Sequence, residues 1–300
     1  MSLSASEQWF VATGGAGGST GALVAAAGGN AYYHFIVETG GTATNWGNQI
    51  AQAAGTATYA SETTGFAACG AFGIDNINAF SFATSGNATD FGDATEAGDG
   101  PDGCQNATRG VMMGRWNGYS TATSSVVDYV TMATAGNATS FGTNYSHYNS
   151  GSASNDTTCL YGGGGYWPGS GNMSPISTCS QLTMATTGSA ATFTSNISAT
   201  YYRHMPSNST RAMHGGGGGQ NLMQYWAFSS PGNATDFGDT TTPRSSGMDN
   251  GITGIMVGGT TTTSDQLTIA TPANATSFSA TFATDIGTYS NSMNSFVSKP

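Results

Sequence analysis

The chain has 300 residues and a formal net charge of −10, and only 7% of its residues are charged. Six basic residues cannot form an extended phosphate-binding surface, so we expect no nucleic-acid partner. No continuous apolar stretch approaches the length of a membrane span, and residues 1–7 lack the basic and apolar regions of a signal peptide, so we expect neither membrane insertion nor secretory export.

A phrase of the form Gly-Asn-Ala-Thr-x-Phe-Gly recurs along the chain. Three complete copies begin at Gly86, Gly136 and Gly232. A fixed interval of roughly 45 residues is typical of propellers and solenoids, in which each repeat is one structural unit. We expect the aromatic residue of each copy to be a structural anchor of its repeat; these residues are Trp46, Phe91, Phe141, Phe193, Phe237 and Phe278.

A strand is predicted before each of these aromatic residues. Apolar residues stand nine and eleven positions before it, from Val37 and Phe35 in the first copy to Ile269 and Leu267 in the last. The residue between them is mostly small or polar, which is the period-2 pattern of a strand with one buried face. No sustained period of 3.6 residues is present, so we predict almost no helix.

A glycine preceded by small or apolar residues is a second landmark of the repeat, at Gly28, Gly70, Gly114, Gly162, Gly215 and Gly258. A cassette of about 45 residues has room for four short strands, which is the size of one propeller blade. We predict an all-β chain with a single β-propeller domain over residues 1–300, made of about six four-stranded blades. The approximate cassettes are 9–64, 65–108, 109–158, 159–210, 211–253 and 254–300.

Two strand-like pieces are left over near Phe10 and Phe296. They either complete one shared blade or form a seventh blade. In both cases we expect the two ends of the chain to meet and close the ring, because closure removes exposed sheet edges.

The repeat resembles that of kelch-type β-propellers, in which an apolar strand ends in a Gly pair and a second apolar strand leads through a turn to an aromatic residue. Residues 109–114, 126–132 and 137–141 follow this order. The chain carries Phe where kelch repeats favour Trp, which only Trp46 matches, and it lacks the second Gly after Gly70 and after Gly114. The phrase is more narrowly similar to degenerate propeller repeats of phage tail and virion proteins.

This resemblance implies a non-enzymatic structural protein of a phage tail or capsid surface that serves in assembly, host-surface attachment or both. It further implies a virion location after synthesis in the host cytoplasm, with other virion proteins and a host-surface glycan or receptor as partners. The alternative is a propeller glycosidase or lyase that acts on host polysaccharide. Carboxylates are absent from the Gly-preceding strands that we expect to line an axial pocket, which favours binding over catalysis.

Aromatic residues in the cassettes 109–158 and 159–210 are not explained by the repeat. Aromatic rings beside Asn, Ser and Gly form adaptable recognition surfaces. The alternative is that these rings only pack between blades. We predict a glycan-binding surface formed by Tyr145, Tyr148, Tyr166, Trp167, Tyr201 and Tyr202.

Acidic residues recur every three positions in one segment, at Asp90, Asp93, Glu96, Asp99 and Asp102. They lack the spacing of a calcium-binding loop, so we interpret the segment as a solvated loop. The histidines form no metal-ligand pair. We therefore predict no metal, no cofactor and no catalytic residue.

The four cysteines contain no C-x-x-C pair, which argues against zinc. Cys69 and Cys159 lie in apolar strands and are expected to be buried. Pairing of Cys159 with Cys179 is left open. The Asn-x-Ser/Thr sequences, such as Asn106-Ala107-Thr108, are interpreted as turns rather than glycosylation sites.

Overall fold

The protein is described by a computed structural model in which every regular element is a β-strand, so the prediction of an all-β fold is confirmed. These strands form six sheets of three to five strands and one two-stranded hairpin. The residues that the structure describes are 21–25, 30–50, 55–70, 73–117, 123–168, 174–197, 206–215, 219–244, 246–257, 263–278, 280–281 and 295–297.

The first three sheets come from the first half of the chain and from its last strands. The first sheet consists of β1 (Gly21–Ala25), β2 (Ala31–Ile36), β3 (Gly40–Asn48), β25 (Ala280–Thr281) and β26 (Ser295–Val297). The second consists of β4 (Ala57–Ala60), β5 (Thr64–Gly70), β6 (Ile74–Ser81) and β7 (Thr89–Asp93). The third consists of β8 (Asp102–Gln105), β9 (Arg109–Trp116), β10 (Thr123–Thr131) and β11 (Thr139–Thr143).

The other sheets follow in chain order. The fourth contains β12 (Gly151–Ser154), β13 (Thr158–Gly162), β16 (Cys179–Thr183) and β17 (Ala191–Phe193), with the hairpin β14 (Gly165–Tyr166) and β15 (Ser174–Pro175) inserted between β13 and β16. The fifth contains β18 (Arg211–Gly215), β19 (Leu222–Ala227) and β20 (Ser230–Asp239). The sixth contains β21 (Ser246–Asp249), β22 (Thr253–Val257), β23 (Ser264–Thr268) and β24 (Thr276–Phe278).

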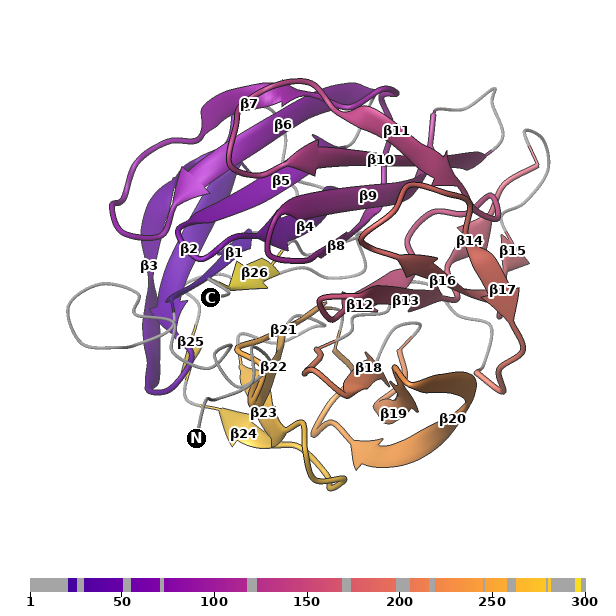
Figure 1. Ribbon diagram of the computed structural model, residues 1–300. Coiled ribbons are helices and arrows are strands. Elements are labelled where there is room, and N and C mark those ends of the chain that lie inside the picture. The colour runs from indigo at the N-terminus through magenta and orange to yellow at the C-terminus, as the bar shows by residue number, and fades with distance from the viewer. Residues whose placement is uncertain are drawn as a thin grey trace, which may run out of the picture.

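The sheets follow one another around a central axis, which is the arrangement of a β-propeller (Figure 1). Strands β26, β4, β8 and β12 contact one another in succession around this axis, and β21 contacts β26. The innermost strand is therefore β26 in the first sheet and the first strand in the second, third, fourth and sixth sheets. In the fifth sheet this place is taken by Ser207, which forms an isolated bridge with Ala212.

The ring is closed by the last strand of the chain. β26 pairs antiparallel with β1, with Phe296 opposite Leu23, so the predicted piece near Phe296 lies in the first sheet. The piece near Phe10 lies outside the described residues. Each cassette thus contributes the outer three strands of one sheet and the inner strand of the next, and the last cassette returns its inner strand to the first sheet.

The apolar pattern of the third strand of each sheet forms the core between sheets. All twelve residues that stand nine and eleven positions before the repeat aromatics are buried, from Val37 and Phe35 to Ile269 and Leu267. Of the aromatics themselves, Phe141, Phe237 and Phe278 are buried, whereas Trp46, Phe91 and Phe193 are partly exposed. Neighbouring sheets share these residues in common apolar clusters, so the repeat period is the period of the core.

The recurrent phrase forms hydrogen bonds with the outer strand of the preceding sheet, and we call this set of contacts the clasp. In the second sheet, Gly86 N donates to Trp46 O at 2.7 Å and Ala88 N donates to Asn48 O at 2.8 Å on the outer strand of the first sheet. The side chain of Asn87 completes the contact, because its Oδ1 accepts from Asn48 N at 3.0 Å.

The same clasp recurs around the ring. Gly136 N donates to Phe91 O at 2.7 Å, and Asn137 Oδ1 accepts from Asp93 N at 3.1 Å. The last copy closes onto the first sheet as the parallel pair of β25 with β3. Each phrase is therefore bound at its start by the preceding sheet and at its end by the following one.

Candidate functional site

Five hairpin turns gather at one end of the axis. Each follows an innermost strand, and four of them begin with an asparagine: Asn106, Asn155, Asn208 and Asn250. The side-chain Oδ1 of each accepts hydrogen bonds from the backbone N–H groups two and three residues later, at 2.8–3.1 Å. In the fifth turn Ser61 Oγ accepts from Thr64 N at 3.1 Å. The interpretation of Asn106 as a turn residue is confirmed.

The amide nitrogens of these asparagines connect the turns to one another. Asn106 Nδ2 donates to Asp156 O at 3.4 Å, and Asn155 Nδ2 donates to Ser209 O at 3.1 Å. Asn250 Nδ2 donates to Glu38 Oε1 at 3.1 Å. Asn106, Asn155 and Asn250 therefore use both polar ends of their side chains within the scaffold, which fixes these turns relative to neighbouring sheets.

Asp249 has a similar structural role at the start of the sixth-sheet turn. Its Oδ2 accepts from Ser207 N and its Oδ1 accepts from Gly251 N, both at 2.9 Å. The side chain is buried. Asp249 therefore links the fifth and sixth sheets, and both of its oxygens are engaged in the scaffold.

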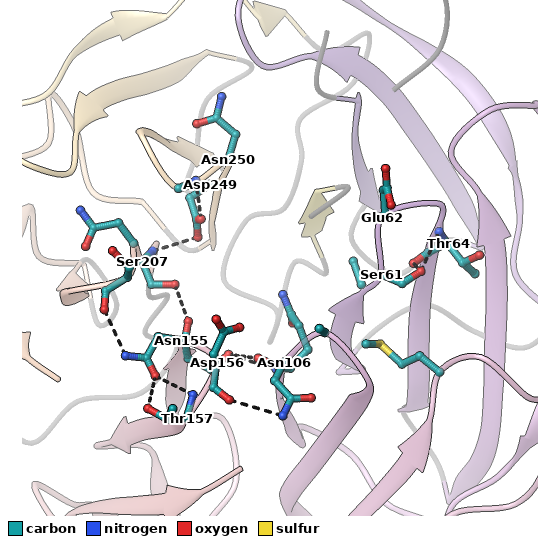
Figure 2. Close-up of a pocket in the computed structure, with 18 of the residues that line it drawn as sticks. Ser61, Glu62, Thr64, Asn106, Asn155, Asp156, Thr157, Ser207, Asp249 and Asn250 are labelled. Atoms are coloured by element: carbon teal, nitrogen blue, oxygen red, sulfur yellow. Dashed lines mark hydrogen bonds between the residues drawn. The ribbon is translucent and has the colours of Figure 1, made fainter. Parts of the chain in front are cut away.

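The turns surround a hollow of about 740 Å³. Figure 2 shows Ser61 and Glu62 facing the turns of Asn106, Asn155 and Asp249 across this space. The size is that of sites that hold small molecules or a few side chains. The lining residues are Ala60, Ser61, Glu62, Thr63, Thr64, Gln105, Asn106, Ala107, Met132, Ala133, Ser154, Asn155, Asp156, Thr157, Ser207, Asn208, Ser209, Asp249, Asn250 and Gly251.

The hollow has negative charges that the scaffold does not use. The exposed carboxylates of Glu62 and Asp156 form no hydrogen bond or ion pair within the described part of the chain. Partial burial raises the pKa of the Asp156 carboxyl above its ordinary value. These two carboxylates are therefore the charged groups that the hollow presents to a ligand.

Two arginines next to the turns face away from the hollow. Arg109 follows the Asn106 turn, but its Nη1 donates to Met184 O and Ala185 O at 3.0 Å. Arg211 donates in the same way to Ile269 O and Ala270 O. Each guanidinium lies over a tyrosine ring, at 4.9 Å from the centroid for Arg109 and 4.7 Å for Arg211. Their positive charge is therefore held on the outer part of the sheets.

The hollow was not predicted from the sequence, and one premise of the sequence analysis is corrected by it. The innermost strands, rather than the Gly-preceding strands, line the axis, and the hollow includes three carboxylates. A usable signal was present, since Asn-x-Thr or Asn-x-Ile recurs at residues 106, 155, 208 and 250, at intervals of 42 to 53 residues. The recurrence does not show that the turns lie around one space, because they become neighbours only when the ring of sheets closes.

The predicted aromatic surface is only partly present as an exposed surface. Tyr148 is buried, and Tyr145 packs against His147 and Tyr161 and donates its hydroxyl to Gly163 O at 3.3 Å. Burial raises the pKa of the Tyr145 phenol well above its usual value. These two rings therefore follow the alternative reading, packing between blades.

The remaining four aromatic residues have different environments. Tyr166 is 40% exposed in β14. Trp167 is partly exposed and lies 6.0 Å from the ring of Trp116. Tyr201 and Tyr202 lie outside the described residues. Glycan contact through Tyr166 and Trp167 stays a prediction.

The acidic segment at Asp90–Asp102 is not one solvated loop. Asp90 is exposed, but Glu96 accepts a hydrogen bond from Ser124 Oγ at 2.8 Å, and Asp102 faces His147 and Ser150. The interpretation as a solvated segment is wrong for Glu96 and Asp102, because both contact neighbouring strands. Within the described residues, no group of His, Cys, Asp and Glu is arranged to hold a metal ion.

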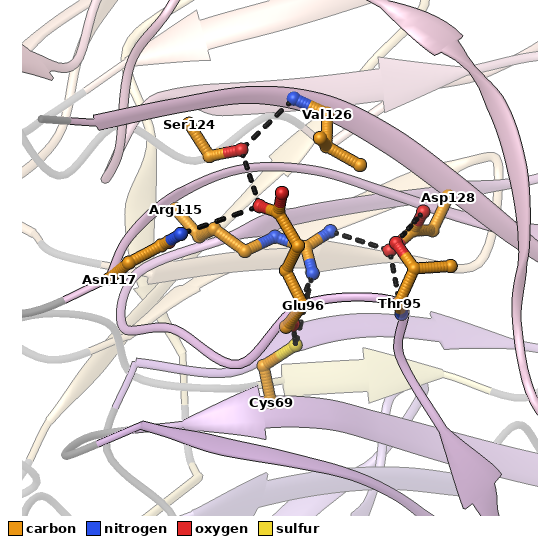
Figure 3. Close-up of polar contacts among 8 residues, drawn as sticks. All are labelled: Cys69, Thr95, Glu96, Arg115, Asn117, Ser124, Val126 and Asp128. Atoms are coloured by element: carbon orange, nitrogen blue, oxygen red, sulfur yellow. Dashed lines mark hydrogen bonds and ion pairs between the residues drawn. The ribbon is translucent and has the colours of Figure 1, made fainter. Parts of the chain in front are cut away.

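Two buried ion pairs take part in hydrogen-bond networks that connect sheets. Arg115 Nη2 lies 3.0 Å from Asp128 Oδ2, and Asp128 Oδ1 accepts from Thr95 Oγ1 at 2.6 Å (Figure 3). Arg244 and Asp265 repeat this arrangement between the fifth and sixth sheets, with Nη2 2.8 Å from Oδ1. Since all four charged groups are buried and paired, we assign them to the scaffold.

The cysteines are structural in this arrangement. All four are buried and free, so Cys159 and Cys179, whose pairing the sequence left open, do not form a disulfide. They belong to apolar clusters on different sides of the fourth sheet. Burial raises the pKa of the Cys69 thiol to about 11, which keeps it protonated.

Two comparisons with known proteins found no match. No protein-family model matches the sequence, and no curated protein is significantly similar to it. A helix that could cross a membrane is not found in the part of the chain that the structure describes. The β-propeller fold is therefore established by the structure alone.

Proposed function

We propose that this chain is a non-catalytic binding propeller of a phage virion, which serves in assembly or host-surface attachment through its axial hollow. The virion role rests on the similarity of the recurrent phrase to propeller repeats of phage tail and virion proteins. The binding role rests on the hollow. Recognition sites are often formed by loops that a rigid scaffold holds in place.

The observation that carries this proposal is how the five turns are built. Their asparagine oxygens cap the turns, and three of the four amide nitrogens hold a neighbouring sheet. Such a site is rigid before a ligand arrives, which lowers the entropic cost of binding. The described lining residues include no His, Cys or Lys, so the groups offered to a ligand are carboxylates, hydroxyls, backbone carbonyls and the side-chain amides of Gln105 and Asn208.

The test compares phage particles that carry two double variants of equal charge change. Glu62→Gln with Asp156→Asn alters the hollow, whereas Asp90→Asn with Asp236→Asn removes two exposed carboxylates from the outer strands. We expect the hollow variant to reduce host adsorption or particle yield at least about tenfold, whereas the control stays within about twofold. Equal behaviour of the two variants in both assays would contradict a role for the hollow.

A separate arm tests the aromatic residues that remain candidates. Tyr166→Ala with Trp167→Ala alters the inserted hairpin, which follows β13 and lies away from the turns of the hollow. A loss of adsorption in this variant alone would place attachment at the hairpin instead. The purified chain should fold normally in both arms, which circular dichroism checks.

The second candidate is a polysaccharide-cleaving propeller, and one observation favours it. Glycosidases use a carboxylic acid of raised pKa together with a second carboxylate. Asp156 has a raised pKa and shares the hollow with Glu62. Incubation of the purified chain with host surface polysaccharide, followed by measurement of new reducing ends, distinguishes the two. We expect no release above that of the Asp156→Asn variant; release that requires Asp156 would favour the enzyme.

A further inference from the structure

The hollow has few hydrogen-bond donors left for a ligand. Asparagines and glutamines commonly bind sugar hydroxyls through paired amide donors and acceptors. Here the amide nitrogens of Asn106, Asn155 and Asn250 donate to neighbouring turns, and their oxygens cap their own turns. These three amides therefore offer no donor to a ligand, and the amide nitrogens of Gln105 and Asn208 are the ones without a partner among the described lining residues.

The free groups of the hollow are acceptors with negative charge. Glu62 and Asp156 are exposed and uncommitted within the described residues, and none of the described lining residues is a lysine or arginine. Arg109 and Arg211, which directly follow two of the turns, are held over tyrosine rings on the outer side. A cationic group would thus meet no repulsion from the described lining residues, and the net charge of −10 favours its approach.

One side of the hollow is apolar. Ala60, Ala107, Met132 and Ala133 line it beside the Ser61–Thr64 turn. Lysine and arginine side chains combine an apolar stem with a charged end, so they can pack the stem on such a surface while the charge reaches a carboxylate. A volume of about 740 Å³ is also larger than one hydrated ion needs.

We propose that the hollow binds a lysine- or arginine-bearing segment of a partner protein. The proposal deepens the proposed function, on which it rests for the identity of the partner as another virion protein. The basic side chain pairs with Glu62 and Asp156, and its stem lies on the Met132 side. Exposed pairs of this kind are individually weak, so binding depends on more than one contact and decreases with salt.

The experiment uses the purified full chain and a fluorescein-labelled tetralysine peptide, followed by fluorescence anisotropy at low salt and at 0.5 M salt. The same peptide with all lysines acetylated retains the length but not the charge. We expect binding of tetralysine at least tenfold tighter than of the acetylated peptide. The Glu62→Gln, Asp156→Asn double variant should lose at least tenfold, and the Asp90→Asn, Asp236→Asn control less than twofold.

Three results would overturn the proposal. The acetylated peptide could bind as tightly as tetralysine, or the hollow variant and its control could lose equally, which would indicate attraction to the net charge alone. A neutral dextran oligosaccharide could displace the peptide, which would identify a sugar site. The outcome is separable from the virion role, because absence of the chain from phage particles would leave peptide binding by the purified chain unchanged.

Discussion

The side chain of Asp99 is largely buried, which disfavours the charged form of its carboxyl group. Desolvation raises its pKa to about 6, although the N–H of Gly100 acts in the opposite direction. Its Oδ1 has no hydrogen-bond partner among the described residues. The folded state therefore retains a proton that the unfolded chain has already lost between about pH 4 and pH 6, so stability should fall as the pH rises through this window.

Asp99→Asn removes that dependence without changing the shape of the side chain. At pH 4 the variant and the parent should have similar stability, because Asp99 is then protonated in the folded state. At pH 7 we expect the variant to be more stable by about 2 kcal/mol, allowing for partial solvent screening. Thermal unfolding at pH 4 and pH 7 checks this; a stability difference that does not change with pH would contradict it.

The repeat aromatics differ in burial, so their replacement should differ in cost. Phe141 is buried and lies edge-on to Tyr129 at 5.8 Å, whereas Phe193 is partly exposed. Phe141→Ala should reduce the free energy of unfolding by about 3–5 kcal/mol, and Phe193→Ala by clearly less. Urea unfolding of both variants measures this. A cost below about 1 kcal/mol for Phe141 would show that the ring is not an anchor.

At the scale of the element, the clasp explains why the phrase ends in Phe-Gly. A Cβ on Gly92, which has a φ of +150°, would overlap the backbone oxygen of Gly136 in the next sheet. A Cβ on Gly136 would meet nothing within 4 Å. The two glycines thus face each other across one contact, but only one of them is required to lack a side chain.

Gly92→Ala and Gly136→Ala are therefore a matched pair. We expect Gly92→Ala to destabilise the fold by about 1–3 kcal/mol, because backbone atoms cannot move aside as a flexible side chain can. Gly136→Ala should cost less than about 0.5 kcal/mol, as is usual for exposed substitutions away from special contacts. The melting temperatures of the two variants test this difference. Equal melting temperatures would contradict the claim that the contact between Gly92 and Gly136 requires a glycine at position 92.

The outer elements could be predicted from sequence and the inner ones could not. Leu182 and Met184 are apolar residues two positions apart, and this alternation is enough to predict strand β16 of the fourth sheet. Both residues are buried. Strand β12, with the sequence Gly-Ser-Ala-Ser, has too few apolar residues for such a pattern, although it lines the axis. The hollow was missed for this reason, since its turns follow the strands that carry the weakest signal.

At the scale of the molecule, closure depends on β26. Three residue pairs join it to β1, and it contacts β21 and β4 on either side. Truncation after Asn294 should reduce stability by a few kcal/mol, because each lost backbone hydrogen bond costs about 1 kcal/mol, and should promote aggregation through the freed edge. Removal of only residues 298–300 is the control. Unchanged solubility and melting temperature after the longer truncation would refute closure by β26.

The prediction of the fold and that of the function depend on different kinds of information. The period and alternation of the chain were enough for the propeller, because every repeat must bury its faces against its neighbours. The proposed virion role rests only on the resemblance of one short phrase, such as Gly136–Gly142, to repeats of phage proteins. That phrase forms the contact between neighbouring sheets. Its resemblance to phage repeats is therefore stronger evidence for the propeller fold than for a location in the virion.

The proposed virion role is tested most directly by quantitative mass spectrometry of purified virions. We expect this chain to be present in the particles at a fixed ratio to the major capsid protein, and the ratio to persist through density-gradient purification. Its presence in infected-cell lysate together with its absence from the purified particles would contradict the claim.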